Sequence, residues 1–215
     1  MRKKSTPEEK QALLILHNLL GFDLDKWKVC DKPDLQNPTD SWGIEVVRDV
    51  YPKEVESAKH LKSVWDMPYS DWPASKVKIL AKNKVKLTIK DNEFCGAILG
   101  ESPNSPDSTI QAIKSKIDLL NKKKYRSFQR YDLYVVVETT CIDKNYVSFV
   151  KQIIDEVVAY QQHSGMKFSK LYLAHHYVLC ICNLENRSFE HKAISLELQE
   201  KIQSQLNTTD IYTID

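Results

Sequence analysis

The sequence predicts a single α/β domain in which helices flank one mixed central sheet. Its 215 residues are enough to bury a substantial core. Hydrophobic residues make up 42% and charged residues 28% of the chain, as in ordinary globular proteins. Helical and strand patterns alternate along the chain, and neither an internal repeat nor a low-complexity linker divides it. We therefore expect one domain over residues 1–215.

The first element is a helix within residues 5–22. Thr6 and Glu9 have the spacing of a capping box, Pro7 suits the first turn, and Gly21 ends the pattern. The helix is apolar nearly all round, so we expect it to pack against the sheet with little exposed surface.

Short strands are expected next, at 27–35 and 42–51, joined by the turn-forming segment QNPTDS. A helix follows at 52–65, and then a link rich in Pro, Trp and Tyr. The alternation of Val85, Leu87 and Ile89 predicts a strand within 76–90.

The second half repeats the alternation of helices and strands. A helix over 109–128 precedes an apolar, β-branched strand at 131–140, which we expect near the middle of the sheet. A helix at 145–162, one or two strands within 170–184 and a helix at 196–206 complete the pattern.

Composition excludes several classes of protein. The net charge of +2 does not by itself indicate a nucleic-acid binder, and no apolar run reaches transmembrane length. The five Cys are scattered without a CxxC pair, so we expect small buried hydrophobes in a reducing, cytoplasmic compartment. The N-terminus lacks the apolar core of a signal peptide.

Two carboxylates carry the functional hypothesis. Asp34 follows Pro33 at a strand end, and Glu45 interrupts the apolar strand GIEVV, where an unpartnered acid is costly. If the two strands pair, the acids converge at one sheet edge and hold Mg²⁺ or Mn²⁺ for phosphodiester hydrolysis. The bland alternative is that Asp34 caps a turn and Glu45 faces solvent from an edge strand.

The segments KPDL and GIEVV resemble the metal-binding half of the PD-(D/E)XK nuclease superfamily, which includes the restriction endonucleases. The resemblance covers about residues 7–140, leaving 141–215 as a C-terminal extension, and it implies a core of helix, three strands, helix and strand. It also implies that Asp34, Glu45 and the backbone carbonyl of Val46 bind the metal.

The sequence departs from this family at one position. The superfamily's Lys is expected two residues after the acid, where this chain has Val47. Some members supply the basic group from the following helix, which here offers Lys114 and Lys116. Some also use a Glu from the first helix, for which Glu8 or Glu9 would serve.

Two functions follow from these residues. The first is a Mg²⁺-dependent nuclease that acts on DNA rather than RNA, with a homodimer left open. The second is a catalytically inactive protein of the same fold that binds nucleic acid or a partner protein.

Two further patterns have both a functional and a structural explanation. Lys82, Lys84 and Lys86 share one parity on the expected strand and form either a phosphate-binding stripe or a solvated strand face. Trp65, Tyr69 and Trp72 either stack on unpaired bases or cover the core.

Overall fold

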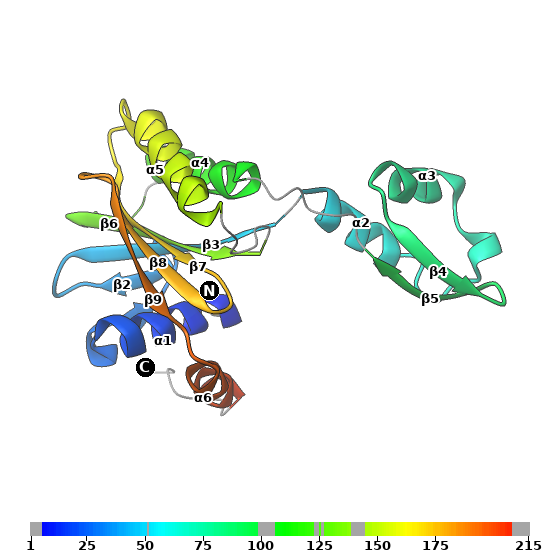
Figure 1. Ribbon diagram of the computed structural model, residues 1–215, viewed down its shortest axis with the longest axis horizontal. Helices are drawn as coiled ribbons and strands as arrows, with labels where there is room; N and C mark the ends of the chain where they lie inside the picture. The colour runs from blue at the N-terminus through cyan, green and yellow to red at the C-terminus, as the bar shows by residue number, and fades with distance from the viewer. Residues whose placement is uncertain are drawn as a thin grey trace.

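A computed structural model describes residues 6–50, 52–98, 106–122, 125, 127–138 and 145–207. Its centre is a seven-stranded mixed sheet in the order β1-β2-β3-β6-β7-β8-β9, with helices on both faces (Figure 1). The mixed α/β class expected from the sequence is therefore confirmed. The strands of this sheet are β1 (Lys28–Val29), β2 (Leu35–Asn37), β3 (Trp42–Asp49), β6 (Arg130–Val137), β7 (Phe168–Ala174), β8 (Val178–Asn183) and β9 (Ser188–Ala193).

The strand directions follow the connections between the elements. The short antiparallel strands β1, β2 and β3 follow one another along the chain, whereas β3 runs parallel to β6 and β6 parallel to β7. β6 lies fourth of seven, which confirms the central position predicted from its apolar residues. The segment expected to hold one or two strands forms the antiparallel pair β7 and β8.

Helices cover the two faces of the sheet. α1 (Pro7–Leu20) and α6 (Leu196–Asn207) lie on one face, and α4 (Asp107–Lys122) and α5 (Tyr146–Gln161) lie on the other (Figure 1). The predicted capping box of α1 is present, and Ala12 to Leu16 are all buried. Within the described part of the chain, no helix is long and apolar enough to cross a membrane.

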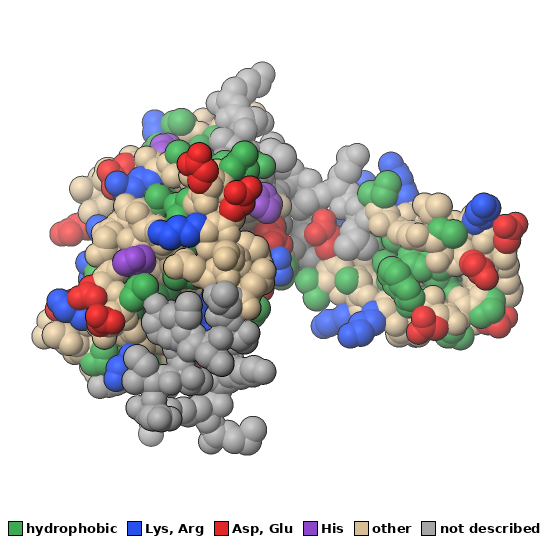
Figure 2. Space-filling model, turned by 90° about the horizontal axis from the view of Figure 1, so that it is seen from below, with side chains coloured by type: hydrophobic (Ala, Val, Ile, Leu, Met, Phe, Trp, Pro, Cys, Tyr) green, Lys and Arg blue, Asp and Glu red, His purple; other side chains and the backbone are tan. Residues whose placement is uncertain are grey.

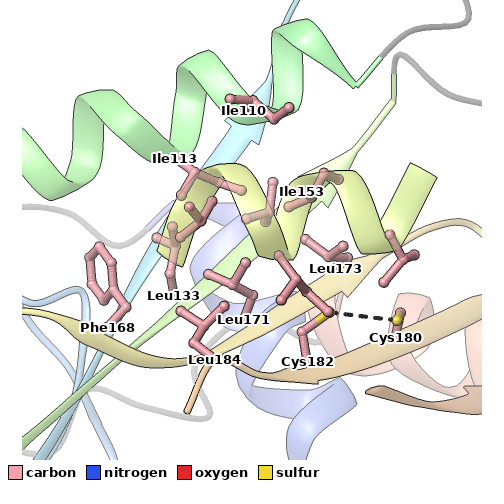
Figure 3. Close-up of a cluster of buried hydrophobic side chains, with 14 of the residues drawn as sticks. Ile110, Ile113, Leu133, Ile153, Phe168, Leu171, Leu173, Cys180, Cys182 and Leu184 are labelled. Atoms are coloured by element: carbon pink, nitrogen blue, oxygen red, sulfur yellow. Dashed lines mark hydrogen bonds between the residues drawn. The ribbon is translucent and has the colours of Figure 1, made fainter. Parts of the chain in front are cut away.

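The larger core lies between the sheet and the helices α4 and α5. Ile110 and Ile113 of α4 and Ile153 of α5 point toward Leu133 and Leu171 of the sheet (Figure 3). Burying such side chains stabilises the fold by about 1.5–3 kcal/mol each. These contacts hold α4 firmly against this face of the sheet.

The cysteines only partly follow the expectation of buried hydrophobes. Cys180 and Cys182 are fully buried in this core, with their sulfur atoms 3.7 Å apart. Cys30 is half-buried and Cys95 is exposed, so the expectation is wrong for Cys95. Cys141 lies outside the described residues.

Residues 52–98 form a lobe that projects from the sheet (Figure 1). It contains α2 (Pro52–Lys62), a short 3₁₀ turn at Tyr69–Asp71, α3 (Ala74–Lys82) and a hairpin of β4 (Lys86–Lys90) and β5 (Glu93–Ile98). Another short 3₁₀ turn, at Leu24–Lys26, lies outside the lobe and precedes β1. Its small core is centred on Leu61, Val64, Trp72 and Leu80, apart from the two clusters that flank the main sheet. The strand expected within 76–90 is wrong over 76–82, which is helical, and right over 86–90.

Candidate functional site

Asp34 is placed by the residue before it and by the strand beside it. Pro33 packs against Gly43 of β3 so closely that a Cβ atom at Gly43 would collide with its ring. Asp34 then precedes β2, and extending the β2–β3 register by one residue brings it opposite Glu45. Directly opposed residues of an antiparallel pair share one face of the sheet. The two acids are therefore a cross-strand pair, as expected if the strands pair.

The Asp34 carboxylate is fixed by the backbone of β3. Its Oδ2 accepts a hydrogen bond from the Val46 N–H at 2.9 Å. A strand residue directs its N–H and C=O toward the same neighbouring strand. The Val46 carbonyl therefore also points toward the edge that carries Asp34, where the resemblance to the nucleases implies a metal ligand.

Glu45 lies in the middle of β3 and is only 2% exposed. Its neighbours Ile44 and Val46 belong to the cluster on the α1 face. Because side chains alternate along a strand, Glu45 points to the opposite face, beneath α4. The alternative of an edge-strand acid facing solvent is therefore wrong.

Lys116 of α4 brings a positive charge to both acids. Its Nζ lies 2.6 Å from Glu45 Oε2 and 3.9 Å from Asp34 Oδ2. Both carboxylates therefore lie around the same cationic nitrogen, closer together than the separation of about 8 Å beyond which one Mg²⁺ could not bind both. The lysine side chain is 20% exposed, whereas those of Asp34 and Glu45 are 7% and 3% exposed. Solvent thus reaches the cluster mainly beside Lys116.

Tyr125, which follows α4, also belongs to the site. Its hydroxyl interacts with the Glu45 carboxylate. Burial, ahead of the nearby negative charge of Glu45, raises the pKa of the Tyr125 hydroxyl, so this group stays a donor at neutral pH. No sequence pattern indicated this residue, because a single Tyr in a basic segment has many ordinary explanations.

The charges of the site act against one another at Glu45. Burial is the largest influence and raises the pKa of its carboxyl, Lys116 lowers that pKa, and Asp34 raises it. Removing Lys116 would therefore leave two buried carboxylates facing each other. A cation at this place is needed electrostatically, and either the lysine or a divalent metal meets that need.

The other expected site residues lie elsewhere. Lys114 Nζ bonds Glu156 of α5 at 2.8 Å and lies over the Tyr160 ring, so it points away from the acids. The Glu9 carboxylate accepts the Thr6 backbone N–H at 3.0 Å in the capping box of α1, on the other face of the sheet.

Glu8 and the arginine after Val47 are also directed away from the pair of acids. Arg48 forms ion pairs with Glu8 and Glu138. Val47 itself packs against the core beneath α4 and α5.

A second buried acid, Asp132 of β6, forms hydrogen bonds within the sheet. It accepts hydrogen bonds from Arg130, Trp42, Tyr172 and the backbone of Lys170. Burial raises the pKa of its carboxyl, and Arg130 opposes that effect. Arg130 belongs to the same strand, whereas Trp42 lies on β3 and Lys170 and Tyr172 on β7, so Asp132 is a structural tie between β3, β6 and β7.

The donor atoms at Asp34 and Glu45 suit a hard cation. Carboxylate and carbonyl oxygens are the ligands that Mg²⁺ and Mn²⁺ prefer. Across the described ranges no group of three or more His, Cys, Asp and Glu side chains could hold a metal ion. Two acids and one carbonyl leave half of an octahedral shell to water and phosphate, and Mg²⁺ sites commonly keep several waters.

The three lysines expected to form a stripe lie on different elements. Lys82 ends α3, Lys84 occupies a turn with φ of 58°, and Lys86 begins β4. All three are exposed. The expectation of a single-strand stripe is wrong, because it depended on a strand where the chain forms a helix and a turn.

Comparisons with protein-family models, with curated proteins and with solved structures found no match.

Proposed function

We propose that this protein is a divalent-metal-dependent nuclease of the PD-(D/E)XK type that acts on DNA. The observation that carries the proposal is the convergence of Lys116 on Asp34 and Glu45. That lysine supplies, from a helix, the basic group that is missing at Val47. The order of α1, the antiparallel strands β1 to β3, α4 and the parallel strand β6 also agrees with the core of that superfamily.

Each residue has a role that its position supports. Asp34 and Glu45 hold the metal together with the Val46 carbonyl, and Tyr125 fixes the orientation of Glu45. The bound metal supplies a more acidic water and a positive charge beside the phosphate. Lys116 stabilises the negative charge that develops on the phosphate during attack.

Metal binding tests the first half of the proposal. Titration of Mn²⁺ into the protein by calorimetry should show binding that Asp34→Ala and Glu45→Ala each abolish. Both variants should first be compared with the wild type by circular dichroism, because each leaves charges unpaired in a buried place. A wild-type protein that binds neither Mn²⁺ nor Mg²⁺ would contradict the nuclease proposal.

Cleavage tests the second half, with two lysines of the same helix as matched variants. Plasmid, linear duplex, single-stranded DNA and RNA should be offered with Mg²⁺ or Mn²⁺. We expect Lys116→Ala to lower the cleavage rate about 100-fold, as the loss of a group that stabilises developing charge usually does. Lys114→Ala should leave the rate nearly unchanged, because Lys114 pairs with Glu156.

The second candidate is an inactive protein of this fold that binds nucleic acid or a partner protein. The close Lys116–Glu45 ion pair favours it, because that pair neutralises the buried acid without a metal. Mn²⁺ binding without cleavage of any of the four substrates would favour this second function over the first.

A further inference from the structure

Trp65 is an exposed aromatic side chain on the projecting lobe. It follows α2 and is 59% exposed. Phe94 of β5 meets it edge-on, with ring centroids 4.9 Å apart, and Phe94 in turn contacts the buried Trp72 at 5.4 Å. Trp65 is thus held in place by an aromatic cluster while much of its own surface faces solvent.

A groove of about 530 Å³ opens beside this ring. The residues that line it come from α2, the turn after it and β5: Ala58, Leu61, Lys62, Trp65, Gly96 and Ala97. Small side chains on both walls leave room for a flat ligand against Trp65. Figure 2 shows hydrophobic side chains gathered on one face of the lobe, with Lys, Asp and Glu side chains toward its edges.

Positive charge is concentrated on the same lobe. Residues 52–98 contain nine Lys against six Asp and Glu, a net charge of +3, whereas the whole chain carries +2. The remainder of the chain is therefore slightly negative. One of these lysines, Lys62, lines the groove itself. An apolar, aromatic groove with a cation at its wall matches a nucleobase attached to a phosphate.

We propose that this groove binds an unpaired base of a nucleic-acid strand, with the base stacked on Trp65 and the phosphate beside Lys62. The inference deepens the proposed function, and cleavage of the bound nucleic-acid strand rests on that function. It assigns as substrate class a nucleic acid that contains a single-stranded segment. Duplex DNA offers no free base face to the groove, because its bases are stacked and paired.

The position of the lobe in the chain fits this role. It is inserted between β3, which carries Glu45, and α4, which carries Lys116. From Glu45 to the end of β3 the strand rises about 13 Å, and α2 adds about 16 Å before Trp65. A nucleic-acid strand held at Trp65 would therefore extend over several nucleotides before it reached Asp34 and Glu45.

Binding without metal tests the groove independently of cleavage. The full-length protein is titrated in EDTA with a labelled oligothymidylate of about 20 nucleotides, longer than the site of a typical single-strand binder, and with a duplex of equal length. We expect tighter binding of the single strand, weakened about tenfold by Trp65→Ala and largely retained by Trp65→Phe. Lys62→Ala should lower the dependence of log affinity on log salt by about 1.

Tyr177→Ala is the matched control, because Tyr177 is also 59% exposed but lies on the main body. It should bind the oligonucleotide as the wild type does. An oligoribonucleotide in a parallel titration shows whether the groove distinguishes RNA from DNA, since stacking alone would accept both.

Three results would overturn the inference. The first is equal binding by wild type and Trp65→Ala. The second is an equal loss with Trp65→Ala and Trp65→Phe for single strand and duplex alike, which would indicate a damaged lobe. The third is a change in sedimentation with Trp65→Ala while oligonucleotide binding stays intact, which would make the groove a contact between copies of this chain. If the protein binds through Trp65 but never cleaves, only the proposed nuclease function is contradicted. If it cleaves and Trp65→Ala does not change binding, only this inference is contradicted.

Discussion

At the scale of single residues, Gly43 decides where Asp34 can lie. A Cβ atom at Gly43 would collide with the Pro33 ring and would lie 3.3 Å from Phe128. We expect Gly43→Ala to displace Pro33 and Asp34, to destabilise the fold by about 1–3 kcal/mol, and to weaken Mn²⁺ binding. Urea denaturation and calorimetry measure the two effects.

Gly165→Ala is the control for Gly43→Ala. A Cβ atom there would meet only Asn121, at 3.6 Å, an ordinary contact. We expect a change within about 0.5 kcal/mol, as for most surface substitutions. Equal denaturation midpoints for the two variants would contradict the role given to Gly43.

Glu45 gives the stability of the metal-free protein a pH dependence. Burial raises the pKa of its carboxyl above its ordinary value of 4.5, so the folded chain holds this proton more tightly than the unfolded chain. Its contribution to stability is therefore present below pH 4.5 and is lost as pH rises through the raised pKa. In EDTA, the free energy of unfolding of the wild type should fall relative to that of Glu45→Gln over this range.

Urea melts at a series of pH values measure this difference between wild type and Glu45→Gln. Mn²⁺ binds only the folded, ionised site, so at neutral pH it should offset the loss in the wild type and have no such effect on the variant. A difference that stays constant with pH would show that Lys116 balances burial at Glu45, and one that rises with pH would show that Lys116 outweighs it.

The two acids were predictable from the sequence, whereas it offered two lysines as their partner and gave no indication of Tyr125. A carboxylate inside GIEVV needs a partner whatever the fold. The choice between Lys114 and Lys116 depends on how α4 is rotated, and both lysines flank the same apolar stripe. The rotation is fixed only when Ile113 and Ile117 pack against the sheet. Tyr125 was missed because it joins the site through the path of the chain after α4.

At the scale of elements, one buried hydrogen bond fixes the beginning of α4. Thr109 Oγ1 donates to Asp49 Oδ2 at 2.6 Å, and both residues are fully buried. The bond ties the helix that carries Lys116 to the strand that carries Glu45. Thr109→Val should leave the Asp49 oxygen without this donor and destabilise the protein by about 1–3 kcal/mol.

Thr109→Ser retains the hydroxyl and separates the hydrogen bond from the methyl contact. We expect Thr109→Ser to keep more of the stability than Thr109→Val, as measured by thermal denaturation. The cleavage rate of Thr109→Val should also fall, because a shifted α4 moves Lys116 away from the acids. A valine variant as stable as the wild type would show that α4 is placed by its apolar stripe alone.

The elements of the lobe show where the sequence patterns were insufficient. Val85, Leu87 and Ile89 alternate and do lie at strand spacing, but only the last two belong to β4. The segment before them, ASKVKILAK, places Val77 and Leu80 three residues apart, and these pack into the small core of the lobe as one side of a helix. Short segments satisfy both periods, so tertiary packing decides between them.

At the scale of the whole molecule, the chain contains two bodies of very different size. The main sheet has a large hydrophobic cluster on each face, whereas the hydrophobic cluster of the lobe has four buried residues among those described, Leu61, Val64, Trp72 and Leu80. The sequence predicted one domain because no linker rich in Gly or Pro separates these parts. The lobe is instead inserted directly between β3 and α4, where an insertion leaves the order of the surrounding elements unchanged.

The small core of the lobe leads to a prediction about local stability. A body of fewer than 50 residues buries a smaller fraction of its surface than a larger domain and is correspondingly marginal. We expect backbone amides of α2, α3 and the β4–β5 hairpin to exchange with solvent deuterium at lower urea concentrations than amides of β3, β6 and β7. Mass spectrometry of peptides from the exchanged protein measures this.

Single-stranded oligonucleotide should then slow exchange in the lobe of the wild type but not of Trp65→Ala, since only a ligand that binds the folded lobe can stabilise it. Equal protection of lobe and sheet across all urea concentrations would mean that the molecule unfolds as one unit, and Trp65 would then belong to the same cooperative structure as the acids.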